Sequence, residues 1–321
     1  MKRVRRILSL TALLGAFALA GCDVDAPPPT HSPAVSPRPT PKPIAPKPVP
    51  QAQSAQSKEL ATYYGRVQAD LLVQGLLRTD GGGPDTPYTD TMLARNFEQI
   101  AFYDEYSGGG LNASNGQAGR LKRWDGPVRF NVEFGSNFTP SQQARYYENV
   151  ASYAARLSRA TGHPIGASPS SGNFHVLFMG EDDRALVQER VRALVPRIDP
   201  SALRIFADLP RSIHCLVVAF SGGQGTYGYT QAVALIRSEH PDLMMRSCIH
   251  EELAQGLGLA NDSPAARPSI FNDDDEFALL TTHDAHLLGM LYDRRLQTGM
   301  NLNAARPIIR QIAAERLGAG F

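Results

Sequence analysis

Residues 248–262 read CIHEELAQGLGLAND, and this stretch decides how the rest of the chain is interpreted. Together with the residues before it, the stretch has the apolar spacing of a helix over 241–257. Gly258 follows directly, where a glycine is typical of a helix end. Glu251 and Glu252 lie about 100° apart around such a helix, so we do not expect them to share a proton.

Upstream of this helix, alternating segments predict strands and periodic segments predict helices. The expected strands are 127–134, 173–179, 214–220 and 231–236, and the expected helices are 57–77, 91–106, 139–161 and 181–194. Strands and helices that follow one another in this order indicate α+β or α/β layer packing around one core.

Two downstream segments extend the pattern, SIFN at 269–272 and LTTHDAHLLGMLY at 280–292. With residues 251–263, they resemble the zinc-helix region of matrixin-type metzincin peptidases. In those proteins a His-Glu helix, a Gly-Leu turn, a third histidine, a Met-turn and a last helix follow one another. The resemblance implies an α+β fold of the zincin class, with a mixed sheet, long helices and a degenerate active-site helix.

The metal-binding positions of that family hold no histidine here. In the alignment that keeps the spacing, the three ligand positions hold Glu251, Gln255 and Asn261. Glu252 stands at the general-base position, and Phe271 replaces the methionine of the turn. An alignment that starts at His250 places alanine at a ligand position and is rejected.

Zinc prefers imidazole and thiolate ligands, so we expect no metal and no other cofactor at these positions. The alternative is zinc or calcium held by the carboxylate and amide oxygens. Without a metal, buried polar groups must pair with one another. We therefore expect a polar network of Glu251, Glu252, Gln255, Asn261, Asp262 and Ser263.

The same region is also similar to a proteobacterial lipoprotein family catalogued as domain of unknown function 2927. Besides the positions already named, Cys248, Asp273, Tyr292 and Met300 match its pattern. The resemblance runs from about Leu77 to Met300 and is most specific after Cys248. It implies a family but no reaction.

The chain begins with the basic residues MKRVRR, followed by an uncharged apolar run over 7–20, which is the layout of a signal peptide. A run of about fourteen residues is too short to span a bilayer. Residues 19–22, Leu-Ala-Gly-Cys, resemble the lipobox of bacterial lipoproteins, which implies lipid, including palmitate, on Cys22. An ordinary secretory cleavage is the alternative. Asp23 resembles the signal that retains lipoproteins in the inner membrane, and the outer membrane is the alternative.

These features divide the chain into five parts. We expect a signal peptide at 1–21, a lipidated cysteine and Pro-rich disordered stalk at 22–57, a helical extension at 58–120, a metzincin-like domain at 121–300 and a C-terminal helix at 301–321. The formal net charge is +1. Such a balance offers no basic surface of the kind that binds nucleic acid.

Two cysteines remain if lipid occupies Cys22. In the oxidising cell envelope, Cys215 and Cys248 are expected to form a disulfide, and two buried free thiols are the alternative. His283 and His286 are expected to be exposed on the last helix. The run 273–276, DDDE, is expected to be an acidic, solvated turn.

The function expected from these observations is that of a periplasm-facing envelope lipoprotein, bound to the membrane through its lipid. Its metzincin-like domain has lost the zinc histidines and binds or scaffolds an envelope protein or a peptide, without catalysis. The alternative is an envelope metallopeptidase that uses Glu252 as general base with unusual ligands.

Overall fold

The computed structural model of the chain describes residues 52–104, 106–107, 112–113, 116–223 and 225–318. All of them belong to one compact unit, residues 48–321. The signal peptide, Cys22 and all but the last six residues of the predicted stalk lie outside the described residues. None of the described helices is long and apolar enough to cross a membrane.

All four predicted strands lie in one mixed sheet. Its strands are β3 (Arg123–Trp124), β4 (Val128–Phe134), β5 (Ile165–Ala167), β6 (Phe174–Phe178), β7 (Cys215–Ser221) and β8 (Gly228–Ile236). β5, β4, β6 and β8 lie next to one another in that order and are parallel. β7 pairs with the far side of β8 and is antiparallel, and β3 pairs with the first residues of β8. A second, two-stranded sheet joins β1 (Tyr106–Ser107) to β2 (Asn112–Ala113).

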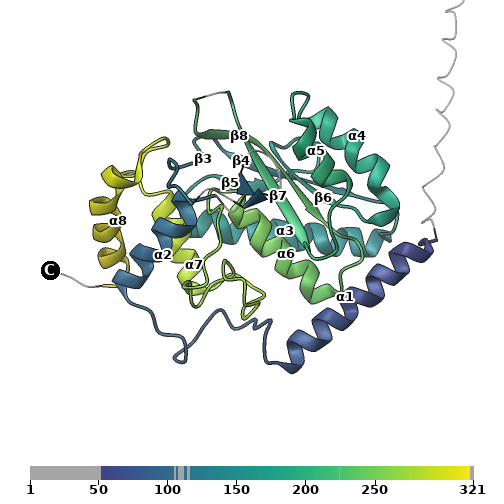
Figure 1. The fold of residues 1–321 in the computed structure, drawn as a ribbon, viewed down its shortest axis with the longest axis horizontal. Helices are drawn as coiled ribbons and strands as arrows, with labels where there is room; N and C mark the ends of the chain where they lie inside the picture. Colours follow the sequence, from purple (N-terminus) through teal and green to yellow (C-terminus); the bar gives the residue numbers. More distant parts are fainter. Residues whose placement is uncertain (1–51, 105, 108–111, 114–115, 224, 319–321) are drawn as a thin grey trace, which may run out of the picture. The chain divides into compact units, whose positions relative to one another are not determined.

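Helices cover both faces of the six-stranded sheet (Figure 1). The helices among the described residues are α1 (Ala55–Val73), α2 (Asp90–Phe102), α3 (Pro140–Thr161), α4 (Arg184–Leu194), α5 (Pro200–Ala207), α6 (Asp242–Gln255), α7 (Thr282–Leu291) and α8 (Leu302–Arg316). Because successive strand residues point to opposite faces, Val176 and Phe178 pack with α3 and α6, whereas Leu177 packs with α4 and α5. The α+β architecture that the sequence predicts is confirmed.

The core does not stop at the boundaries predicted at 120 and 300. Phe97 and Ile100 of α2 and Ile309 and Ile312 of α8 are buried in the same cluster as α6 and α7. The segments on either side of the predicted central domain therefore fold together with it.

Three differences from the predicted elements have local causes. α1 begins at Ala55, inside the predicted stalk, because Ser54 accepts a hydrogen bond from the Ser57 N–H and caps the helix. The helix predicted over 181–194 starts as a 3₁₀ turn, η1 (Glu181–Asp183), and only then becomes α4. α5 was not predicted, since eight residues after a proline give little periodic signal.

Candidate functional site

α6 ends against the sheet in a tightly packed turn. A side chain at Gly256 would lie 2.5 Å from the ring of Phe174 and 3.0 Å from Val217. Gly258 has a φ of 130°, and a side chain there would lie 2.3 Å from the Lys122 carbonyl oxygen. The glycines of the Gly-Leu turn are therefore needed for the close approach of α6 to the strands.

The three positions that correspond to metal ligands make contacts of another kind. The Gln255 amide donates a hydrogen bond to Asp262, at 3.3 Å from Nε2 to Oδ1. The Asn261 amide donates to two backbone carbonyls, those of Gln99 and Asp262. The Gln255 amide thus joins the end of α6 to the segment that follows it, and the Asn261 amide joins that segment to α2. This donor set, one carboxylate and two neutral amides, does not fit zinc.

The turn at Ser269–Phe271 is fixed by a buried aspartate of α7. Asp284 accepts hydrogen bonds from the Ser269 hydroxyl at 2.6 Å and the Ile270 N–H at 3.1 Å. It also accepts from the N–H and the hydroxyl of Thr281, at 2.9 and 2.7 Å. Burial raises the pKa of Asp284, but its polar contacts outweigh burial and the net pKa lies below the usual value. Asp284 is therefore an ionised anchor for this turn.

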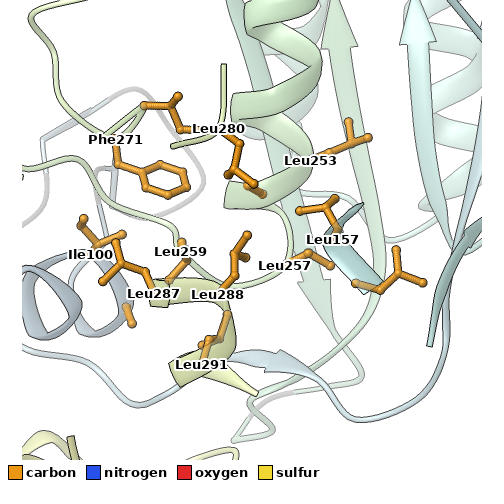
Figure 2. Close-up of a cluster of buried hydrophobic side chains, with 14 of the residues drawn as sticks. Ile100, Leu157, Leu253, Leu257, Leu259, Phe271, Leu280, Leu287, Leu288 and Leu291 are labelled. Carbon is orange, nitrogen blue, oxygen red and sulfur yellow. The ribbon is translucent and has the colours of Figure 1, made fainter. Parts of the chain in front are cut away.

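Beside this turn, leucines fill the space between the end of α6 and α7. Figure 2 shows Leu259 close to Leu287 and Leu288, with Phe271 on the other side of the same cluster. Phe271 is fully buried. Phe271 is thus part of the apolar core. The buried Ser263 is linked to it through the backbone, since the Ser263 N–H donates to the Phe271 carbonyl at 2.8 Å, while the Ser263 hydroxyl accepts from the Ala265 N–H.

His250 is held away from the glutamates. Its Nδ1 accepts a hydrogen bond from the Leu280 N–H at 2.9 Å, and its ring stacks on Tyr153 at 4.0 Å between centroids. The Tyr153 hydroxyl donates to the His250 carbonyl. Burial lowers the pKa of His250 to about 3. The alignment that uses His250 as a ligand is thus not supported by its contacts.

The low pKa of His250 predicts a pH dependence of stability. Between about pH 6.5 and pH 3, the unfolded chain binds a proton at this residue and the folded chain does not. The contribution of His250 to the free energy of unfolding is therefore complete above pH 6.5. On acidification below that pH, the free energy of unfolding falls by about 1.4 kcal/mol per pH unit. His250→Asn keeps an acceptor for Leu280 and removes the titration. Urea unfolding at pH 6 and pH 5 should give a smaller difference for this variant; an unchanged difference would contradict the assignment.

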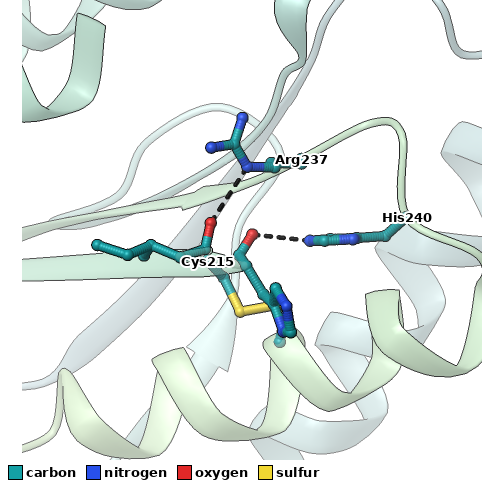
Figure 3. Close-up of a disulfide and its surroundings, with 6 residues drawn as sticks. Cys215, Arg237 and His240 are labelled. Carbon is teal, nitrogen blue, oxygen red and sulfur yellow. Dashed lines mark hydrogen bonds between the residues drawn. A yellow bond between two sulfur atoms is a disulfide. The ribbon is translucent and has the colours of Figure 1, made fainter. Parts of the chain in front are cut away.

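The predicted disulfide between Cys215 and Cys248 is confirmed, with 5.9 Å between the two Cα atoms. It joins the first residue of β7 to α6. Arg237 and His240 hold the chain just before Cys215, as Figure 3 shows. The Arg237 guanidinium donates to the carbonyls of Ile213 and Pro210, and the His240 ring nitrogen lies 2.7 Å from the His214 carbonyl oxygen.

Both glutamates of α6 reach the disulfide. A carboxylate oxygen of Glu251, one of Glu252 and the Cys215 sulfur all lie within 4.8 Å of one another. Glu252 is 3 % exposed, and Glu251 is half-buried. Their side chains converge although neighbouring positions diverge around a helix. Sequence reasoning missed this cluster, because β7 and α6 come together only through the sheet.

β7 offers a free backbone edge. The Ala232 N–H bonds to Asn173 and the Ile236 carbonyl bonds to Met179, so even-numbered residues of β8 face β6. The backbone N–H and C=O groups of the odd-numbered residues of β8 then point toward β7. Because Val218 lies opposite Val233, the backbone groups of Val218 and of every second residue of β7 from it point back toward β8. Val217 and Ala219 direct their N–H and C=O groups away from β8, where no strand of the described residues pairs with them.

The prediction that both histidines of α7 are exposed is wrong. His283 is fully buried, since its Nε2 lies 3.1 Å from the Asn96 amide and its ring contacts Tyr88. His286 is half-buried. The apolar spacing of α7 gave no sign that α2 covers this face. The acidic turn is exposed at residues 273–275, whereas Glu276 pairs with Arg78 and Arg267.

Comparison with protein families identifies a match over most of the domain. A family described as protein of unknown function (DUF2927) matches residues 90–311. No curated protein and no solved structure matches the chain. The match covers the whole sheet, α6, the turn at Ser269–Phe271 and most of α8, and it leaves α1 outside.

Proposed function

The chain belongs to the family of proteins of unknown function DUF2927, and from that premise we propose that it is an envelope lipoprotein whose domain binds an extended peptide along β7 without cleaving it. The observation that carries the proposal is the free backbone edge at Val217 and Ala219. An extended peptide adds to such an edge as a further strand, with main-chain hydrogen bonds providing affinity.

The order of elements supports a metzincin-like origin for the domain. A mixed sheet comes first, then α6 with its Gly-Leu turn, then the turn at Ser269–Phe271 and α7. This is the order that the sequence resemblance implies. The donor set at Glu251, Gln255 and Asn261 supports the loss of the zinc ion, because it holds neither imidazole nor thiolate.

The position of β7 supports binding close to α6. Val217 contacts the Gly256 turn, and Cys215 at the start of β7 lies beside Glu251 and Glu252. A peptide paired with β7 would therefore run along the strand nearest to the former catalytic helix. Basic residues 1–6, the apolar run 7–20 and the lipobox at Cys22 support an anchor that holds this surface at the membrane.

The test is a pair of substitutions at one residue. Ala219→Pro removes an outward N–H and leaves the pairs that join β7 to β8, since proline is tolerated at a strand edge that faces solvent. Ala219→Ser keeps the N–H. We expect Ala219→Pro to weaken binding at least tenfold and Ala219→Ser to leave it within twofold, with similar thermal midpoints for both.

The measurement is fluorescence anisotropy with labelled decapeptides selected from a random library on the immobilised chain. A library that yields no binder would contradict the proposal. Equal affinity of the two variants would also contradict it, because binding would then not use the edge of β7.

A further inference from the structure

A second cluster of metal-binding side chains shares Glu251 with the degenerate positions. Among His, Cys, Asp and Glu of the described residues, the group Cys215, Glu251 and Glu252 is compact enough to hold an ion. Cys248 is not part of this group, but its sulfur is bonded to that of Cys215, and it lies one helical turn before the two glutamates on α6. In the oxidised chain these sulfurs carry no charge, so they are poor ligands. Only thiolates bind metals strongly.

We propose that reduction of the Cys215–Cys248 disulfide creates a binding site for a thiophilic divalent cation, zinc above all. The two thiolates and the carboxylates of Glu251 and Glu252 are its ligands. Zinc sites accept both sulfur and carboxylate oxygen, at about 2.3 and 2.0 Å from the metal. The Cys215 sulfur and the two carboxylate oxygens already lie within 4.8 Å of one another and need to close by only about an ångström to reach such distances. The Cys248 sulfur, once released from Cys215, moves apart from it to become the fourth ligand.

The chemical step balances with a dithiol as reductant. The dithiol supplies two electrons and two protons and becomes a disulfide, while the bond between Cys215 and Cys248 breaks to give two thiols. On metal binding, the two thiols lose their protons to solvent and become thiolates. The cation then neutralises two of the negative charges that the thiolates and carboxylates bring together.

The backbone around the site does not depend on the disulfide. Cys215 is held by its pairing with Ile236 and by the hydrogen bonds from Arg237 and His240 to the residues just before it. Cys248 lies in the middle of α6 and is buried. Both sulfurs therefore stay beside the glutamates when the bond between them is broken.

The glutamates make this site different from a chance pair of thiols. Glu252 is almost fully buried, and Glu251 reaches the same sulfur from the neighbouring helix position. A buried carboxylate is stabilised by a cation, and a mixed sulfur and oxygen set excludes magnesium and calcium, which prefer oxygen alone. We therefore expect selectivity for zinc and cobalt over magnesium and calcium.

The test is a titration of the full chain in detergent with Co²⁺, before and after reduction by a phosphine under nitrogen. We expect one Co²⁺ per chain only after reduction, with a thiolate charge-transfer band that Zn²⁺ abolishes and Mg²⁺ does not. Glu251→Gln with Glu252→Gln should weaken binding at least tenfold. Glu148→Gln, on the exposed surface of α3, is the matched control and should bind as tightly as the unchanged chain.

Three results would overturn the proposal. They are an absence of saturable binding after reduction, equal binding by the double glutamine variant, and equal binding by the oxidised chain. Thermal melting covers the case in which reduction loosens the fold. Zn²⁺ should raise the melting temperature of the reduced chain and not that of the oxidised chain, and a reduced chain that zinc does not stabilise would also overturn it. Peptide binding is measured on the oxidised, metal-free chain, so the two proposals fail separately.

Discussion

Replacing Asp284 by asparagine is expected to lower the free energy of unfolding by about 4 kcal/mol, because a fully buried carboxylate with four hydrogen-bond donors loses its charge and most of its acceptors. The asparagine amide nitrogen would face buried donors, of which only the Thr281 hydroxyl has another acceptor among the described residues, the Pro268 carbonyl. The turn at Ser269–Phe271 would then lose its attachment to α7.

Asp273→Asn is the matched control for this loss. Asp273 lies on the exposed acidic turn, so the same change should alter stability by no more than about 0.5 kcal/mol. Urea unfolding at pH 7 measures both variants. The pKa of Asp284 is lowered in the fold, so its contribution is complete above about pH 4 and is lost only as the pH falls further. A loss below 1 kcal/mol at pH 7 would contradict the role of Asp284 as anchor.

Removing the disulfide is expected to lower the free energy of unfolding by about as much as Asp284→Asn does. Cys215 and Cys248 are 33 residues apart, and closing a loop of that length constrains the unfolded chain by about 4 kcal/mol in the chain-entropy account. The double variant Cys215→Ser with Cys248→Ser should therefore melt at a lower temperature. It should keep its secondary structure, since Arg237 and His240 still hold the segment before residue 215.

Chemical reduction provides the control. A phosphine should destabilise the unchanged chain by the same amount as the double variant, and it should have no effect on the double variant itself. Circular dichroism during thermal melting measures both. A double variant as stable as the unchanged chain would show that the disulfide contributes nothing to the fold.

Much of the fold follows from local patterns. β4, β6, β7 and β8 were predicted because their residues alternate or form short apolar runs, and α3 because Thr139 and Pro140 mark its start. β5 has three residues, too few to show a period. The sequence also could not reveal that α2 and α8 pack against each other, since that contact joins segments about 200 residues apart.

The candidate site was predictable only in part. The spacing from Glu251 to Asn261 predicted the helix and the turn at its end. The cluster of Cys215 with Glu251 and Glu252 depends on where β7 lies in the sheet, which no local pattern specifies. For the same reason the pattern placed His283 at the surface, whereas Asn96 and Tyr88 of a distant segment bury it.

The central proposal is that the domain binds an extended peptide and does not cleave it. The direct measurement is made on the oxidised chain, with zinc content by elemental analysis and mass spectrometry of a bound decapeptide after prolonged incubation. We predict less than one zinc per ten chains and an intact peptide. Stoichiometric zinc together with peptide cleavage that Glu252→Gln abolishes would contradict the account and establish a peptidase.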